Sequence, residues 1–306
     1  MQENFAFFIT CFSLFIYFLL SSIEFGSSLF AVFPNLVNEK DMVNEYLNPI
    51  WETTTVFLVF SLTSMFACFP GATLRWGTDL FTLVFTILAI FAVRIICILF
   101  KQYSDVKSRF VDILYFLASL VVPILFSLVI LYFLTGSWIL YIKTSLYFWF
   151  ALSVIAFIVT MTLAFFRVYK KNGALTKFLR LSGTLFFLST TFFLITIAKD
   201  LPYLFSNNYI ETYIASLMIF FIVIILFTES SEKYIWSFIF FCFFMTTLFW
   251  ALFIAHLPYI IYPTTTLASS VTDSASLMLI SWSFVVGMVI LLPALFLLYK
   301  LFVFKK

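Results

Sequence analysis

The sequence has 306 residues, of which 64% are hydrophobic and 10% are charged, and its formal net charge is +3. A soluble domain has roughly 25% charged residues and cannot hide this much apolar surface in one core, so the composition excludes a soluble globular protein and indicates one embedded in lipid. The small net charge, with no basic cluster, argues against nucleic acid as a partner.

Apolar stretches predict an all-α integral membrane protein. A helix that crosses the hydrocarbon layer needs about 20 apolar residues. On this rule we expect about nine transmembrane helices, near residues 5–33, 51–70, 79–100, 111–134, 144–167, 180–198, 210–228, 235–257 and 275–304. Polar or turn-forming breaks separate them, such as Asn35–Asn48, Pro70–Thr78 and Lys170–Lys177, and Pro258–Ser274 is expected to be an irregular external segment. We expect one membrane domain over residues 1–306, with two four-helix bundles and a ninth helix.

The distribution of Lys and Arg predicts the orientation. With the amino terminus outside, most positive charges fall in cytoplasmic segments, and the external segments hold only Arg75, Lys143 and Lys199. This asymmetry follows the positive-inside rule, favours an odd number of spans and puts the carboxyl terminus in the cytoplasm. Because Met1–Phe8 contains no Lys or Arg, the first segment is expected to be a retained helix and not a cleaved signal peptide.

The residues that commonly bind metals are few and scattered. Cys11, Cys68, Cys97 and Cys242 lie far apart in apolar stretches, which is typical of small buried side chains. The single histidine, His256, stands at a span end, where an interfacial role is the simpler interpretation. We therefore expect no metal or haem to be ligated by this chain. The sequence also shows no nucleotide-binding loop or catalytic-triad spacing, which favours a subunit that serves a catalytic partner.

Four ionisable residues fall within or at the start of predicted spans. They are Glu24, Glu52, Arg94 and Asp112. A charge at this depth costs several kcal/mol, about 3 in insertion experiments, so it calls for a partner, a wet cavity or a function. The alternation of spans places all four near the cytoplasmic end of the first four helices, where they could form an ion-pair network or a proton entry path.

Structural roles compete with this interpretation. Glu52 and Asp112 stand at helix starts, where a carboxylate favours the positive end of the helix dipole. Arg94 can extend toward the membrane surface or pair with an acid. Trp51 is typical of the membrane interface. Glu24 lies within a span with no capping role, so it is the strongest candidate for a functional residue.

Several stretches together resemble subunit II of the cytochrome bd-type quinol oxidases. They are Ser21–Gly26, Asn48–Leu58 followed by Phe69-Pro70, Phe91–Arg94, Asp112, Trp236, Pro258–Thr265, Asp273–Ser276 and Leu292–Tyr299 before a basic tail. The similarity covers roughly the first 125 and the last 70 residues, and it rests on the order and spacing of these motifs.

The resemblance implies a specific function. Such a subunit packs against a larger subunit that holds two b-type haems, haem d and the quinol site, and a small single-span subunit can join them. In the bacterial cell membrane the complex oxidises quinol and reduces oxygen to water, with protons taken from the cytoplasm. Carboxylates at positions matching Glu24 and Glu52 deliver protons in the family, and Arg94 would orient or pair with them.

The sequence departs from the family at the expected proton path. The first acid and Gly of span 1 are here Ser21 and Ser22, and an acid expected after the Arg is Leu99. Hydroxyls such as Ser21, Ser22 and Ser27, with trapped water, could bridge the gap. A secondary transporter or channel that uses Glu24 and Arg94 is an alternative, although the few in-span glycines do not form the broken-helix pattern of transporters. A purely structural scaffold is the third alternative.

Overall fold

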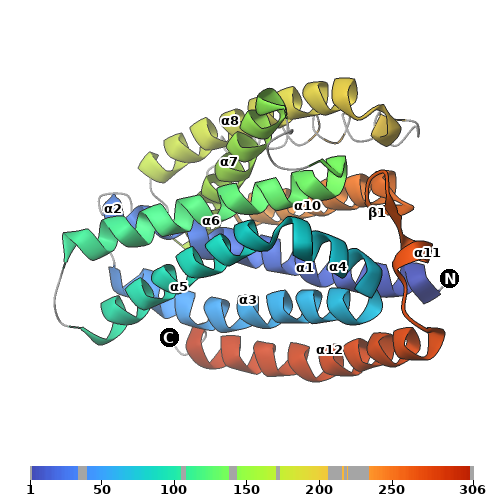
Figure 1. The fold of residues 1–306 in the computed structure, drawn as a ribbon. Helices are drawn as coiled ribbons and strands as arrows, with labels where there is room; N and C mark the ends of the chain where they lie inside the picture. Colours follow the sequence, from blue (N-terminus) through green and yellow to red (C-terminus); the bar gives the residue numbers. More distant parts are fainter. Residues whose placement is uncertain are drawn as a thin grey trace.

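A computed structural model describes residues 2–33, 40–104, 108–137, 143–169, 173–205 and 234–303, with the single positions 216 and 219. Its elements are, in chain order, α1 (Gln2–Gly26), α2 (Leu29–Val32), α3 (Lys40–Cys68), α4 (Pro70–Asp79), α5 (Phe81–Tyr103), α6 (Arg109–Thr135), α7 (Thr144–Tyr169), α8 (Gly173–Asp200), the 3-10 turn η3 (Pro202–Phe205), α10 (Tyr234–His256), β1 (Tyr259–Ile261), β2 (Thr265–Thr266), α11 (Leu267–Ser270) and α12 (Ser274–Val303). The described part of the chain is thus almost entirely helical (Figure 1).

Among the described residues, six helices are long and apolar enough to cross a membrane. They are Gln2–Val32, which joins α1 and α2 across a short turn, Phe81–Lys101, Arg109–Thr135, Thr144–Val168, Leu175–Asp200 and Tyr234–His256. The ninth predicted span falls on α12, which contains the shorter apolar helix Ala275–Ile290. The seventh predicted span, 210–228, lies outside the described residues. These helices make the chain an all-α multi-pass membrane protein, and the count of nine and the division into two bundles stay predictions.

The second predicted span differs from the expectation. Thr54–Cys68 and Pro70–Asp79 form a pair of helices bent by 113° at Phe69, so the predicted break Pro70–Thr78 is helical. Proline is favoured in the first turn of a helix, where its missing N–H has no intrahelical partner to lose. Pro70 therefore starts α4 instead of ending the structure.

Two other predicted breaks are also partly helical. Helix α3 begins at Lys40, inside the predicted break Asn35–Asn48, because polar residues can continue a helix beyond the lipid. In the predicted break Lys170–Lys177, likewise, α8 is already helical from Gly173.

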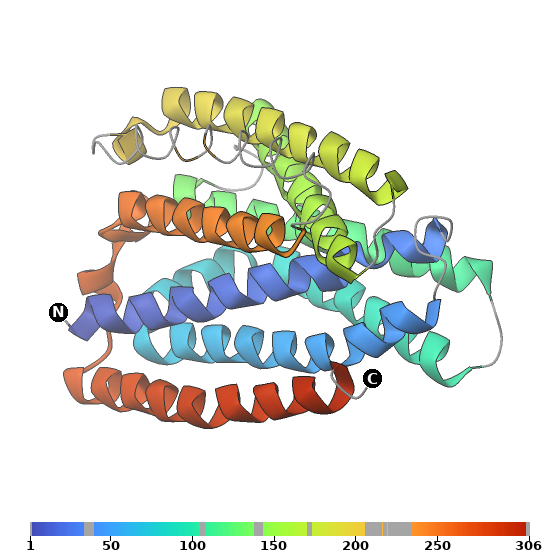
Figure 2. The same cartoon turned by 180° about the vertical axis from the view of Figure 1, so that it is seen from behind.

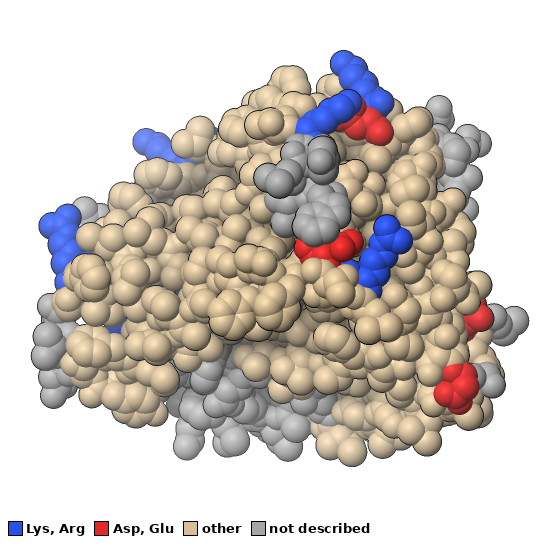
Figure 3. Space-filling view, in the orientation of Figure 1, with Lys and Arg blue, Asp and Glu red and all other residues tan. Residues whose placement is uncertain are grey.

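Helix α1 occupies the middle of the molecule. It is the most buried of the six spanning helices, while α5 is the least buried. Helices α12, α3 and α1 lie side by side in both views (Figures 1 and 2). A charge near the carboxyl end of α1 is therefore surrounded by protein, whereas large apolar side chains on the outer faces of α5 and α12 are exposed. The face seen in Figure 3 shows wide uncharged areas, as expected of a surface in contact with lipid.

The segment between α10 and α12, predicted as irregular, is ordered. Strands β1 and β2 pair antiparallel, and Thr266 caps α11 with a reciprocal bond to Ser269. The hairpin packs on the end of α6, where the Tyr262 N–H donates to the Phe133 carbonyl at 3.1 Å. Gly136 makes this approach possible, since its φ is +61° and a Cβ atom there would lie 1.7 Å from the Tyr262 carbonyl oxygen. The hairpin lies at the same end of the molecule as the amino terminus, and the carboxyl end lies at the other (Figure 1).

Candidate functional site

An ion pair between Glu24 and Arg94 lies buried between α1 and α5. The Arg94 Nη1 atom lies 2.5 Å from Glu24 Oε1. Arg94 is 0% exposed and Glu24 is 3% exposed, so neither charge reaches the surface of the chain. Arg94 does not extend toward the membrane surface, which was one of the two structural roles predicted for it. Each charge instead compensates the other, as an ionised pair in an apolar interior requires.

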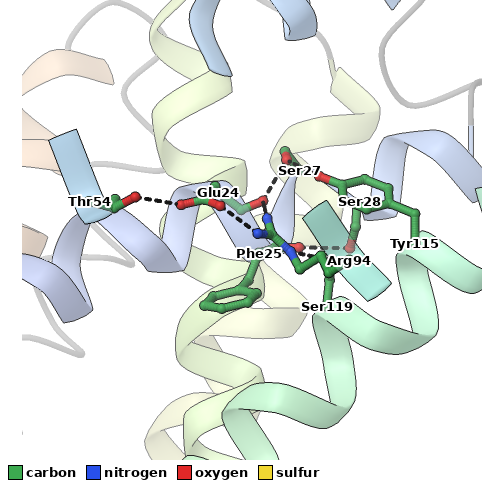
Figure 4. A network of polar contacts seen from close by, with 8 residues as sticks. All are labelled: Glu24, Phe25, Ser27, Ser28, Thr54, Arg94, Tyr115 and Ser119. Carbon is green, nitrogen blue, oxygen red and sulfur yellow. Dashed lines mark hydrogen bonds and ion pairs between the residues drawn. The ribbon is translucent and has the colours of Figure 1, made fainter. Parts of the chain in front are cut away.

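Hydrogen-bond acceptors and aromatic rings surround the guanidinium of Arg94 (Figure 4). Its Nε donates to the Ser119 hydroxyl at 3.0 Å, and Nη2 donates to the Glu24 backbone carbonyl at 3.3 Å. The rings of Phe25 and Tyr115 face the cation, with 4.5 Å and 5.5 Å from the guanidinium carbon to the ring centres. Hydrogen bonds and aromatic faces together fix both the position and the charge of this side chain.

The carboxylate of Glu24 uses both oxygens. Oε1 accepts from Arg94, and Oε2 accepts from the Thr54 hydroxyl on α3 at 2.8 Å. Thr54 is 2% exposed. Helix α1 ends two residues later, at Gly26, and the Ser27 hydroxyl donates to the Glu24 carbonyl at 2.7 Å. Side chains from α3, α5 and α6 thus converge on the last turn of α1.

Glycine at position 26 lets another helix approach this turn. A Cβ atom on Gly26 would lie 2.0 Å from Thr162 Oγ1 of α7 and 3.0 Å from the Ile158 carbonyl. The Thr162 hydroxyl lies against the Ser22 carbonyl at 3.1 Å and donates to it. Small residues allow such close contact between membrane helices, and here the contact seats α1 against α7 beside the ion pair.

Ser21 and Ser22 are buried on α1 but point their hydroxyls at their own helix. Ser21 donates to the Phe18 carbonyl at 3.4 Å and Ser22 to the Leu19 carbonyl at 2.6 Å. Within the described part of the chain, neither hydroxyl is hydrogen-bonded to the Glu24 carboxylate. The structure therefore brings together Glu24 and Arg94, and leaves the two serines beside them.

Asp112 belongs to a second, separate ion pair. It lies in the first turn of α6 and pairs with Lys101, in the last turn of α5, at 2.7 Å. The side chains are 19% and 31% exposed, respectively. Each charge also complements the dipole of its own helix. The ring of Tyr115 stands between the two pairs, since it contacts both Arg94 and Lys101.

Replacing Asp112 by Asn should therefore have a small effect. Partly exposed ion pairs contribute about 0.2–1 kcal/mol. We expect the Asp112→Asn protein in detergent to unfold within a few degrees of the unchanged protein, measured by the thermal midpoint. A loss of about 3 kcal/mol would show instead that Asp112 is part of the buried network.

Trp51 and Glu52 lie on α3, but their side chains are outside the described residues. The backbone places Glu52 two residues before Thr54 on the same helix. Its relation to the Glu24 carboxylate stays a prediction.

Histidine and cysteine do not form a metal site in the described residues. His256 uses both ring nitrogens, which lie 3.0 Å from the Tyr203 hydroxyl and 3.1 Å from the Ile260 carbonyl. The four cysteines are free thiols, and no group of three or more His, Cys, Asp or Glu that could hold a metal occurs within the described ranges.

Thr54, Ser119 and Tyr115 complete the site but were not predicted. Each is a polar residue inside an apolar span, which is a weak signal because such hydroxyls usually bond to their own helix. Ser119 lies about two turns after Asp112 on α6, so the predicted depth of Arg94 could have drawn attention to it.

Comparison with known proteins gives one consistent result. Residues 2–302 match the family model for cytochrome bd terminal oxidase subunit II. A protein of Bacillus subtilis (strain 168), named "Putative cytochrome bd menaquinol oxidase subunit II", is 26% identical over 95% of this chain and 93% of its own length. A chain in the structure of bd oxidase from Geobacillus thermodenitrificans has the same fold, with a TM-score of 0.84 and 23% identity over 100% of this chain and 99% of that one.

Proposed function

Because this chain belongs to the family of cytochrome bd terminal oxidase subunit II, we propose that it is the accessory subunit of a bacterial quinol:oxygen oxidoreductase and that it delivers protons through Glu24 and Glu52. The observation that carries this proposal is the carboxylate of Glu24, buried beside Arg94 in the middle of a membrane protein. A buried ionisable group in a membrane span is by default a functional candidate.

The partner in this proposal is the larger subunit I, against which the chain packs. Subunit I supplies two b-type haems, haem d and the quinol site, and this chain ligates none of them. The name of the Bacillus subtilis relative favours menaquinol as the electron donor. We further propose nine spans in one domain, with the amino terminus outside and the carboxyl terminus in the cytoplasm.

The chemistry of the pair suits a group that takes a proton and then releases it. Arginine stays protonated, so an ionised Glu24 gives a neutral pair. A carboxyl group can take up a proton and pass it on, whereas the guanidinium beside it keeps its protons and fixes the position of the carboxylate. Glu52, Ser21 and Ser22 are the proposed neighbours on this route.

The oxidoreductase interpretation replaces the transporter alternative. A transporter would use Glu24 and Arg94 as a coupling site at a helix break near the membrane midplane. Among the described helices, the pair bent by more than 40° meets at Phe69, between α3 and α4. The short turn after Gly26, beside Glu24, leaves α1 and α2 within one span, Gln2–Val32. Family membership assigns the chain to an oxidase complex.

Replacing Glu24 by Gln should lower quinol-driven oxygen consumption by about 100-fold or more, because a positioned proton donor typically contributes a factor of about 10²–10⁴. The number of spans should not change. The measurement is oxygen uptake by the purified complex, normalised to haem content from its absorption spectrum.

A double variant separates proton transfer from charge balance. In Glu24→Gln alone, the Arg94 cation is left without its carboxylate, which can weaken assembly of the complex. Glu24→Gln with Arg94→Met removes the titratable group and leaves no unpaired charge, so the double variant should assemble normally while its oxygen consumption stays low. Oxygen uptake at the rate of the unchanged complex in this double variant, with normal haem content, would remove Glu24 from the mechanism.

A further inference from the structure

Thr54 holds the oxygen of Glu24 that Arg94 leaves accessible to a proton. Arg94 Nη1 occupies Oε1 at 2.5 Å, and the guanidinium cannot turn away easily because Ser119 and the Glu24 carbonyl hold its other nitrogens. Protonation at Oε1 would break this charge-assisted bond. The proton must therefore add to Oε2, whose hydrogen-bonding partner is the Thr54 hydroxyl at 2.8 Å.

A hydroxyl group suits this position because it donates and accepts. When Glu24 is ionised, Thr54 donates to Oε2. When Glu24 is protonated, Oε2–H must donate to the Thr54 oxygen, and the Thr54 hydrogen must turn to another acceptor. A threonine in a helix has such an acceptor in the backbone carbonyl one turn earlier, as Thr160 does with Ala156 at 2.7 Å. Thr54 can thus serve both states of Glu24 without leaving a buried polar atom unpaired.

We propose that the Thr54 hydroxyl is a proton relay to the Oε2 atom of Glu24. This inference rests on the proposed function. In a concerted step, a protonated donor, either water or a carboxylic acid, passes one proton to the Thr54 oxygen while the Thr54 hydrogen moves to Glu24 Oε2. One O–H bond breaks at the donor and one forms at Glu24, and Thr54 carries one hydrogen before and after. Rotation of the hydroxyl then resets it.

The position of Thr54 in the fold supports this role. It is 2% exposed, so bulk water does not compete for Oε2. It stands on α3, and its hydroxyl reaches across to the last turn of α1, where Glu24 lies. Among the described residues, no other side chain is hydrogen-bonded to Oε2 (Figure 4).

The test compares Thr54→Val with Thr54→Ser in the haem-loaded complex. Valine keeps the branched shape and removes the hydroxyl, whereas serine keeps the hydroxyl. We expect oxygen consumption to fall about tenfold in Thr54→Val and to stay within about twofold of the unchanged rate in Thr54→Ser. Thr160→Val is the matched control, since Thr160 is equally buried on α7 and bonds only to its own helix.

The ratio of rates in H₂O and D₂O separates a relay from a packing role. It should rise in Thr54→Val, where proton transfer becomes limiting, and stay constant in Thr54→Ser and Thr160→Val. If Thr54→Val yields no haem-loaded complex, Thr54→Ala removes the same hydroxyl with less bulk. Full activity and an unchanged ratio in a variant without the hydroxyl would overturn the relay. If Glu24→Gln lowers activity at the same time, the proposed function survives and only the relay fails.

Discussion

The Arg94→Met variant is expected to assemble poorly, with a loss of about 3–5 kcal/mol in stability. Methionine fills a similar volume but leaves the Glu24 carboxylate buried without its cation. Ser119 also loses the N–H that it accepts, and the rings of Phe25 and Tyr115 lose the charge that they face. The measurement is the yield of haem-loaded complex and its thermal unfolding midpoint.

The double variant Glu24→Gln with Arg94→Met should recover most of this loss, because removing both charges of a buried pair is often neutral. Lys101→Met is the matched control: it removes a cation from the same helix, but from the partly exposed pair with Asp112. We expect this control to change stability by less than about 1 kcal/mol. Equal losses in Arg94→Met and Lys101→Met would contradict a special role for the buried pair.

Gly26→Ala should destabilise the protein by about 1–3 kcal/mol, the usual cost of overpacking. The new Cβ atom would meet Thr162 Oγ1 at 2.0 Å and the Thr162 Cβ at 2.8 Å, so α1 and α7 would have to separate. Because Glu24 lies on the same turn, the distance from its carboxylate to Arg94 should change as well. Thermal unfolding and oxygen consumption of the complex should therefore fall together.

Two further variants test the cause. Gly287→Ala on α12 is the control, since a Cβ atom there has nothing within 4 Å, and the helix preference of alanine should leave stability unchanged or higher. Thr162→Gly combined with Gly26→Ala removes the atoms that clash and should restore part of the loss. An unchanged midpoint in Gly26→Ala would show that the two helices are not held at this distance.

The sequence predicted the pair of charged residues better than their surroundings. Glu24 and Arg94 stood out because a charge inside an apolar span is costly, and the alternation of spans placed them at the same end of neighbouring helices. Which acid meets Arg94 depends on how each helix is rotated about its axis, and apolar patterning hardly fixes this rotation when lipid and core are both apolar. Asp112 was grouped with Arg94 for this reason, although the structure pairs it with Lys101.

The hydroxyl groups that bond to Glu24 and Arg94 could not be predicted either, because their contacts also depend on how each helix is rotated about its axis. Thr54 and Ser119 join the site only because α3 and α6 present one face of each helix to α1 and α5, and several other threonines and serines in the spans bond to their own helices. The bend at Phe69 was missed because hydropathy detects the lipid layer and not the ends of helices. Pro70 marked the end of the apolar run correctly, but it also begins α4.

The hairpin between α10 and α12 has a mechanical consequence. Its Tyr262 N–H is bonded to the end of α6, and the following Thr272 N–H donates to the Cys68 carbonyl at the end of α3 at 3.1 Å. The segment between α10 and α12 thereby connects the ends of α3 and α6, which are distant in the chain, at the end of the molecule that holds the amino terminus. The two ends of α1 therefore lie in different settings: loop segments connect the helices near its amino end, and side chains from α3, α5 and α7 surround its last turn, which carries Glu24.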